Sequence, residues 1–301
     1  MNDTSSPGPV VILGLLSTGL AGTVIQLIAL TRQVFVIEAA IRKDRSPLAP
    51  FNLQLLTMSA SLLAVHICYI VQIIYGHNTS LPWILTLLLD FFSATFEFAY
   101  VRYSWTRAST IIAQRINSLS LRIITFFVKI CPFILYAQTL PALFDAIASH
   151  YPPLAPYLAT VSPIEQGLSA LAGVCLLCFD VTLLIGFASK TRAMKKEMNE
   201  VGITGSASAR TEVIVRHGVV SCCVWICVVM VYAASTFLEQ FSFQYNLITV
   251  FIYWGSLGTV AVLYHMKVAL FKLDGKESMV HVSLGTGNAG GKDSSTQASN
   301  V

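Results

Sequence analysis

Residues 82–107 read PWILTLLLDFFSATFEFAYVRYSWTR, and this stretch decides the fold class. It is apolar for longer than the roughly 20 residues that a helix needs to cross a bilayer. It nevertheless carries two acids, Asp90 and Glu97, within the apolar run. Seven residues make two helical turns, so the two acids share one face of the helix. Because an ionisable side chain inside a membrane faces protein or a wet cavity, we expect this helix at the centre of a helical bundle.

The rest of the chain has the composition of a polytopic membrane protein. Of its 301 residues, 55% are hydrophobic and 11% are charged, against about 25% charged residues in a soluble domain. We therefore expect the lipid bilayer, and not nucleic acid, as its environment and partner. Helices are expected rather than barrel strands, because a helix satisfies its own backbone groups. The segments long enough to span a bilayer are residues 10–36, 51–75, 82–106, 124–147, 164–188, 215–237 and 246–270.

The distribution of basic residues predicts the topology. All 19 Lys and Arg residues fall on one side, in alternate connections, in the C-terminal tail or in the adjoining segment ends. This asymmetry places the N-terminus outside and the C-terminus inside. Two Asn-x-Ser/Thr glycosylation sequons, at Asn2 and Asn78, fall on the outer side.

The predicted fold is thus an all-α bundle of seven transmembrane helices, which we expect in the plasma membrane. Its predicted parts are an extracellular tail (1–9), the membrane domain (10–271) and a disordered cytoplasmic tail (272–301), which is rich in Gly, Ser and Thr.

Acidic residues towards the outer side of the membrane indicate a ligand site. A buried carboxyl group with no basic neighbour binds a proton, binds a cation or accepts hydrogen bonds. We expect His66 to contact Asp90, because both lie at equal depth on antiparallel neighbouring helices. Phe96 and Tyr100 are expected to flank the acids, which would suit a cationic or amphipathic ligand. Alternatively, the acids are protonated and only hold helices together. The acids at this level or further out are Asp3, Asp90, Glu97, Asp145, Glu165 and Glu239, with no Lys or Arg among them.

A second charge pair is predicted in the inner half. Arg102 lies 20 residues into the third segment, and Asp180 lies at inner membrane depth in the fifth. We expect these side chains to pair and to act as a switch, because an unpaired charge in lipid is costly. The alternative is that Arg102 extends to the lipid headgroups.

No catalytic, metal or cofactor site is predicted. The sequence shows no His, Asp or Glu cluster with metal-ligand spacing, and no Ser-His-Asp set that can be placed at one depth. We therefore expect the protein not to be an enzyme. A retinal protein needs a lysine in the middle of its last helix, whereas Lys267 lies at the inner end.

Seven helices, an outer N-terminus, a short glycosylatable tail, a basic third inner connection and a Ser/Thr-rich C-terminus resemble the G-protein-coupled receptor superfamily. Arg102 and Tyr103 are similar to the acid-Arg-Tyr motif of rhodopsin-like members, with Val101 in place of the acid. The resemblance is one of topology and covers nearly the whole chain.

This resemblance implies a receptor that senses an extracellular ligand and signals to a heterotrimeric G protein through residues 107–123 and 189–214. Arg102, Tyr103 and Asp180 would form its switch. A small-solute or proton-coupled transporter or channel is the alternative, although no internal repeat of the kind common in transporters is evident. A membrane enzyme or scaffold is a third possibility.

Overall fold

The predicted all-α fold is confirmed. The computed structural model describes residues 7–41, 49–75, 82–113, 117–150, 158–201, 206–235, 237–238 and 242–287, and within these ranges it contains helices and short turns but no strand. Seven helical stretches are long and apolar enough to cross a membrane: Gly8–Glu38, Pro50–Tyr75, Ile84–Ile112, Ser118–Phe144, Gly167–Ala193, Ala209–Ser235 and Phe243–Asp274. They correspond in order to the seven predicted segments. The N-terminus outside the membrane stays a prediction.

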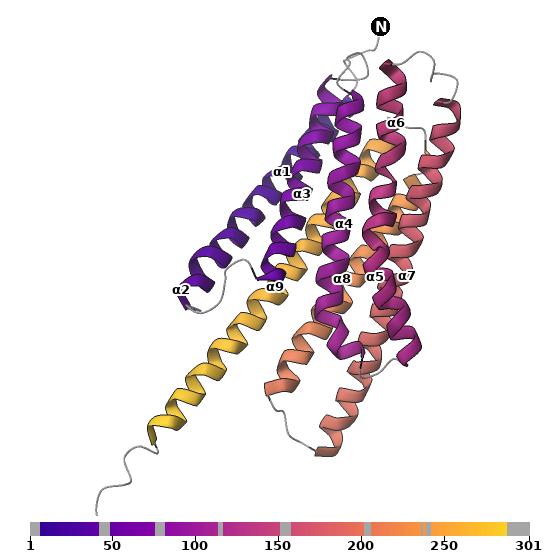
Figure 1. Cartoon of the computed structure of the whole chain (residues 1–301). Coiled ribbons are helices and arrows are strands. Elements are labelled where there is room, and N and C mark those ends of the chain that lie inside the picture. Colours follow the sequence, from indigo (N-terminus) through magenta and orange to yellow (C-terminus); the bar gives the residue numbers. More distant parts are fainter. Residues whose placement is uncertain are drawn as a thin grey trace, which may run out of the picture.

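The helices follow one another with short connections (Figure 1). Their bounds are α1 Pro7–Arg32, η1 Gln33–Glu38, α2 Ala39–Ile41, α3 Pro50–Tyr75, α4 Pro82–Ile112, α5 Ser118–Ala137, α6 Thr139–His150, α7 Leu158–Val201, α8 Ser206–Ser235 and α9 Phe243–Gly287. η1 is a π-helical turn that continues α1, so these two elements form one span.

Local sequence explains where several helices begin. Pro7, Pro50 and Pro82 are the first residues of α1, α3 and α4. Proline suits this position because its fixed φ angle matches the helix and its missing N–H would have had no partner there. Asn117 caps α5, since its extended backbone lets its side-chain oxygen accept a hydrogen bond of 2.8 Å from the backbone N–H of Ser120.

The fourth span is interrupted, as its prolines predict. α5 ends at Ala137, and α6 begins at Thr139, with Gln138 between them. Pro141 lacks the N–H that would bond to the Ala137 carbonyl, and its ring crowds that carbonyl. The break therefore falls one turn before Pro141 and leaves the polar residues Gln138 and Thr139 within the bundle.

The spans form a ring in sequence order, in which the third span joins the second to the fourth and also packs against the fifth and sixth. α1 packs against both α3 and α9, while α7 packs against α8 and α8 against α9. α4 contacts α3, α5, α6, α7 and α8, as expected for a central helix. We name the end of the bundle where α1 begins the upper end, as drawn in Figure 1, and the opposite end the lower end.

Two helices continue beyond the lower end of the bundle. α7 runs to Val201, and α9 runs on to Gly287 as a long single helix that leaves the bundle (Figure 1). Helical backbone thus extends into residues 272–287, which were expected to belong to a disordered tail. The proposed division into three parts otherwise stays a prediction.

Large apolar side chains cover the outside of the bundle as well as filling its core. A soluble protein rarely exposes a wide apolar surface, whereas a membrane protein turns such a surface towards lipid. Exposed examples on successive spans are Ile25, Ile74, Phe91, Phe133, Ile185, Met230 and Phe251. Tyr100, Tyr103, Leu55, Leu183 and Val260 are among the side chains fully buried inside.

Candidate functional site

The two acids of α4 lie in the upper half of the bundle and face its interior. Asp90 interacts electrostatically with Glu165 of α7 and with Tyr245 of α9. Glu97 lies two turns lower, and its carboxyl group interacts with Gln138 at the α5–α6 break. The two carboxyl groups also influence each other. The shared face predicted for the two acids therefore points towards three other spans.

Both acids keep an acceptor atom without a partner. Oδ2 of Asp90 and Oε2 of Glu97 are buried, and neither has a hydrogen-bond partner in the described part of the chain. The phenol of Tyr232 on α8 is near enough to both carboxyl groups to interact electrostatically with them. We name this set the upper acid site: Asp90, Glu97, Gln138, Glu165, Tyr232 and Tyr245.

The predicted contact between His66 and Asp90 is wrong as a hydrogen bond. His66 is fully buried, its Nδ1 lies 2.9 Å from the Leu62 carbonyl oxygen, and its Nε2 has no partner among the described residues. Its ring packs against Tyr253 of α9, with centroids 5.3 Å apart. Depth along a helix does not determine which face of α3 carries the histidine.

Gly19 of α1 explains how His66 fits there. A Cβ atom at position 19 would lie 2.9 Å from His66 Nε2 and 3.0 Å from Trp254 Nε1. Glycine therefore provides the space in which the imidazole lies between α1 and α9. The predicted ligand-binding role of His66 has no contact with the acids to support it.

Phe96 and Tyr100 belong to a layer that begins at the level of Glu97 and continues below it. They are four residues apart on α4, and both rings pack against Trp225 of α8, with centroid distances of 5.5 Å and 5.0 Å. All three side chains are buried. We name Phe96, Tyr100, Trp225 and Asp180 the middle layer, because Tyr100 donates a 2.7 Å hydrogen bond to Asp180 Oδ1.

The predicted pair of Arg102 and Asp180 is therefore wrong. Arg102 is exposed on the bundle surface, and Asp180 is completely buried against Tyr100. Each residue advances a helix by about 100°, so Arg102 lies about 200° around α4 from Tyr100. Tyr103, the third predicted switch residue, is fully buried, and its hydroxyl lies 3.5 Å from the Leu263 carbonyl oxygen.

The lower half contains an ion pair that the sequence analysis did not predict. Lys267 of α9 donates to Glu38 Oε1 at the end of η1, and both side chains are buried. The second carboxylate oxygen of Glu38 accepts a 3.1 Å hydrogen bond from the Asn52 side-chain amide on α3. This network joins α3 and α9 to the end of the first span. π-helical turns are rare and often mark functional sites.

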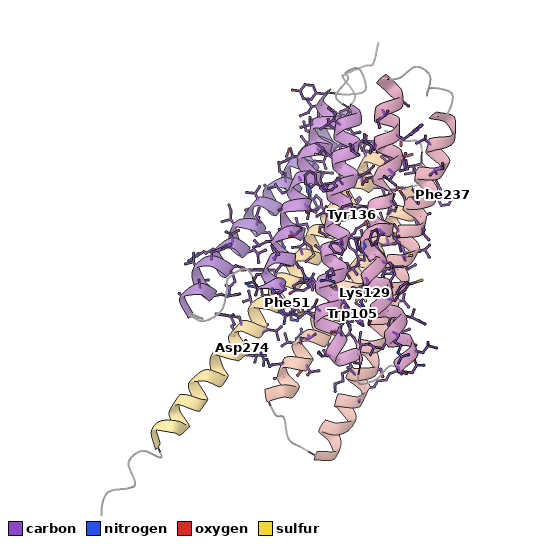
Figure 2. The ribbon with its side chains drawn as sticks, viewed as in Figure 1. Phe51, Trp105, Lys129, Tyr136, Phe237 and Asp274 are labelled. Atoms are coloured by element: carbon purple, nitrogen blue, oxygen red, sulfur yellow. The ribbon has the colours of Figure 1, made fainter. Side chains whose placement is uncertain are left out.

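Arg107 lies at the same end of α4. Its guanidinium carbon stands 3.8 Å from the centre of the Phe51 ring and 5.9 Å from that of Tyr103. Figure 2 shows Phe51 at the lower end of α3. Such cation–π contacts stabilise a guanidinium by about 0.5–2 kcal/mol. Arg107 Nε is buried and has no hydrogen-bond partner within the described ranges.

A small cavity lies between α4, α7, α8 and α9 in the lower half. Its volume is about 20 Å³, which is enough for one water molecule. Polar groups from Ser104, Arg107, Ser221 and Cys222 line it, together with Tyr103. It extends from the level of Arg107 towards the middle layer.

Several predicted features lie outside the described residues or are not tested. The sequons at Asn2 and Asn78 are outside the described ranges, as are residues 114–116 and 202–205 in the two connections expected to meet a G protein. In the part of the chain that the structure describes, no group of three or more His, Cys, Asp or Glu residues is arranged to hold a metal ion.

Comparison with known proteins gives no relative. The sequence matches no protein-family model and no curated protein. The arrangement of its residues is therefore the basis for assigning a function.

Proposed function

We propose that this seven-helix membrane protein is a receptor that senses an extracellular ligand and signals to a cytosolic partner such as a heterotrimeric G protein. The main observation that supports this proposal is that α4 runs from the upper half of the bundle to the lower half. This single helix carries Asp90 and Glu97 in the upper half and Tyr103 and Arg107 in the lower half, and it packs against five other elements. When a ligand in the upper half shifts such a helix slightly, the contacts of the helix in the lower half also change.

The upper acid site supports a ligand with a positive charge or several hydrogen-bond donors. Asp90 Oδ2 and Glu97 Oε2 are buried acceptors without partners in the described residues. A ligand ammonium group would satisfy either acceptor, and such charge-assisted bonds are among the stronger hydrogen bonds. The phenol rings of Tyr232 and Tyr245 would offer an apolar and aromatic wall beside it.

A proton-coupled transporter or channel is the second candidate. Buried acids in a membrane bundle are a common feature of proton pathways, and this observation favours it. The middle layer favours the receptor, because Phe96, Tyr100 and Trp225 pack ring against ring between the upper acid site and the lower cavity. In the described residues this layer separates the two polar regions.

The two functions can be separated with the full-length protein in lipid. The protein in nanodiscs is mixed with purified G-protein heterotrimers of each major class, and the rate of nucleotide exchange is measured. We expect faster exchange on at least one heterotrimer and a smaller effect from Arg107→Ala. No acceleration on any heterotrimer, combined with an Asp90-dependent proton flux into proteoliposomes, would contradict the receptor and support the transporter.

Ligand chemistry is tested by thermal stabilisation. A panel of organic amines and their uncharged analogues is added to the purified protein, and the melting temperature is recorded. We expect some amines, but not their neutral analogues, to raise it, and Asp90→Asn to remove the effect. Arg102→Met is the matched control, because that side chain lies outside the bundle. Stabilisation that persists in Asp90→Asn would place the ligand elsewhere.

A further inference from the structure

Asp180 is a fully buried acid that the proposed function does not use. It lies on α7 within the membrane-spanning range Gly167–Ala193, and none of its surface is exposed. Its Oδ1 accepts the hydrogen bond from Tyr100, but its Oδ2 has no partner in the described part of the chain. Only one of the two carboxyl oxygens therefore has a hydrogen-bond partner among the described residues.

No positive charge faces this acid among the described residues. The titratable groups that interact with it are Tyr100 from α4 and Cys222 from α8. Both can donate a hydrogen bond, but neither is a cation at neutral pH. Arg102, the nearest basic residue along α4, lies on the far side of that helix and is exposed. A charged carboxylate in this position would be buried without a counter-ion, which costs several kcal/mol.

Two further buried polar atoms, on residues near Tyr100, have no hydrogen-bond partner in the described part of the chain. Ser221 Oγ is buried, has no hydrogen-bond partner in the described chain, and lines the lower cavity next to Cys222. Nε1 of Trp225, one turn along α8, is likewise unpartnered, and its ring packs on Tyr100. Buried polar atoms without partners are rare in folded proteins and call for an explanation, such as an ordered water or a bound ion.

We propose that Asp180 is an internal proton-binding site, with the proton on Oδ2 and a water molecule in the adjoining cavity as its route to the lower end of the bundle. A protonated carboxyl group is neutral, so it needs no counter-ion. Its Oδ1 remains a carbonyl oxygen that accepts from Tyr100, and its new O–H can donate to a water that also bonds with Ser221. Proton uptake converts a carboxylate and a hydronium ion into a carboxylic acid and water.

A proton fits this site better than a metal cation. Hard cations such as Ca²⁺ take six to eight oxygen ligands. The oxygen atoms that could converge here are those of Asp180, Tyr100 and Ser221, and the Tyr100 O–H already points its proton at the carboxyl group. The cavity of about 20 Å³ leaves room for one water and not for a hydrated ion.

Proton release would be linked to the packing of three helices. Losing the proton leaves a negative charge between α4, α7 and α8, and that charge is stabilised only when water or a cation reaches it. Deprotonation therefore favours a state in which α7 and α8 separate at the lower cavity. The site would make the conformation of the lower half sensitive to cytosolic pH, whether or not the protein couples to a G protein.

Infrared spectroscopy of the full-length protein tests the site directly. The triple variant Asp90→Asn/Glu97→Gln/Glu165→Gln serves as the background, so that the acids of the upper acid site do not contribute. We expect this background to show the C=O stretching band of a protonated carboxylic acid at neutral pH, with the usual small shift in D₂O. Adding Asp180→Asn should remove the band. If Asp180→Asn removed the bands of an ionised carboxylate instead, the proposal would be overturned.

Two further measurements keep the proposal falsifiable if Asp180→Asn does not fold. Tyr100→Phe removes the hydrogen bond to Oδ1, so the carbonyl band should move to higher frequency, and an unchanged band would overturn the assignment. Exchange of potassium for sodium in the buffer should leave the band intact. Its disappearance with sodium would show that the site takes a cation in place of the proton.

Discussion

The upper and lower halves of the bundle treat their charged residues in different ways. In the upper half, Asp90 and Glu97 each keep a buried oxygen without a partner in the described residues. In the lower half, Glu38 is bonded through one oxygen to Lys267 and through the other to Asn52, and Arg107 stacks on Phe51. The lower half is thus held together by an ion pair between distant helices. The upper half instead keeps two buried acceptor atoms, which the proposed ligand would satisfy.

The largest effect is expected from opening the lower ion pair. Lys267→Met leaves Glu38 charged and buried without its cation, which should lower the free energy of unfolding by about 3–5 kcal/mol. Lys129→Met is the matched control, because Lys129 is exposed on α5 and its loss should change stability by less than about 0.5 kcal/mol. Unfolding in mixed micelles measures both variants. Equal stability of the two would mean that the ion pair does not hold the lower half together.

A smaller effect is expected at the middle layer. Tyr100→Phe removes the hydrogen bond to Asp180 and leaves the aromatic packing on Trp225 in place. If Asp180 is neutral, as we infer, the loss should be that of an ordinary hydrogen bond, about 1 kcal/mol. Tyr75→Phe on the exposed end of α3 is the control. A loss well above 2 kcal/mol would indicate a bond to an ionised carboxylate.

Removing an acid from the upper half should raise the free energy of unfolding slightly or leave it unchanged, in contrast to the losses predicted above. Asp90→Leu eliminates a buried carboxyl group with an unpartnered oxygen, so the free energy of unfolding should stay the same or rise by up to about 1 kcal/mol. The same substitution at Glu38 should destabilise the protein, because it removes the buried carboxylate to which Lys267 donates. Thermal denaturation of both Leu variants compares the halves directly. If Asp90→Leu were as harmful as Glu38→Leu, the comparison would fail.

The smallest effect on stability is expected from the variant that tests which side of the membrane each half faces. If the N-terminus is outside, the upper half faces the extracellular side, and the sequons at Asn2 and Asn78 are available for glycosylation. Expression in a eukaryotic cell should then give a protein that loses mass with a glycosidase, and Asn78→Gln should remove part of that mass. Antibody access to an N-terminal epitope only after permeabilisation would reverse the orientation.

Periodicity and charge counts were enough to predict the spans and the central helix. The spacing of Asp90 and Glu97 predicted their common face. Contacts between distant helices were beyond such reasoning. Lys267 and Glu38 are 229 residues apart, and pairing them requires knowing that α1 and α9 close the ring.

The two incorrect pairs failed for one geometric reason. The depth of a residue along a helix follows from counting residues. The direction of its side chain around the helix axis, however, changes by about 100° with each residue. His66 packs against Tyr253, whereas Asp90 interacts with Glu165. Arg102 lies near Asp180 in depth, yet Tyr100 occupies the side of α4 that faces it. One available signal was the neutral, hydrogen-bonding Tyr100 two residues before the arginine.

Two double-mutant cycles, measured by unfolding of the full-length protein in mixed micelles, test the central claim most directly. The first combines Glu38→Gln with Lys267→Met, and the second combines Arg102→Met with Asp180→Asn. The account predicts a coupling energy of about 2 kcal/mol or more for the first pair and additivity within about 0.5 kcal/mol for the second. Additive behaviour of Glu38 and Lys267, or strong coupling of Arg102 and Asp180, would contradict it.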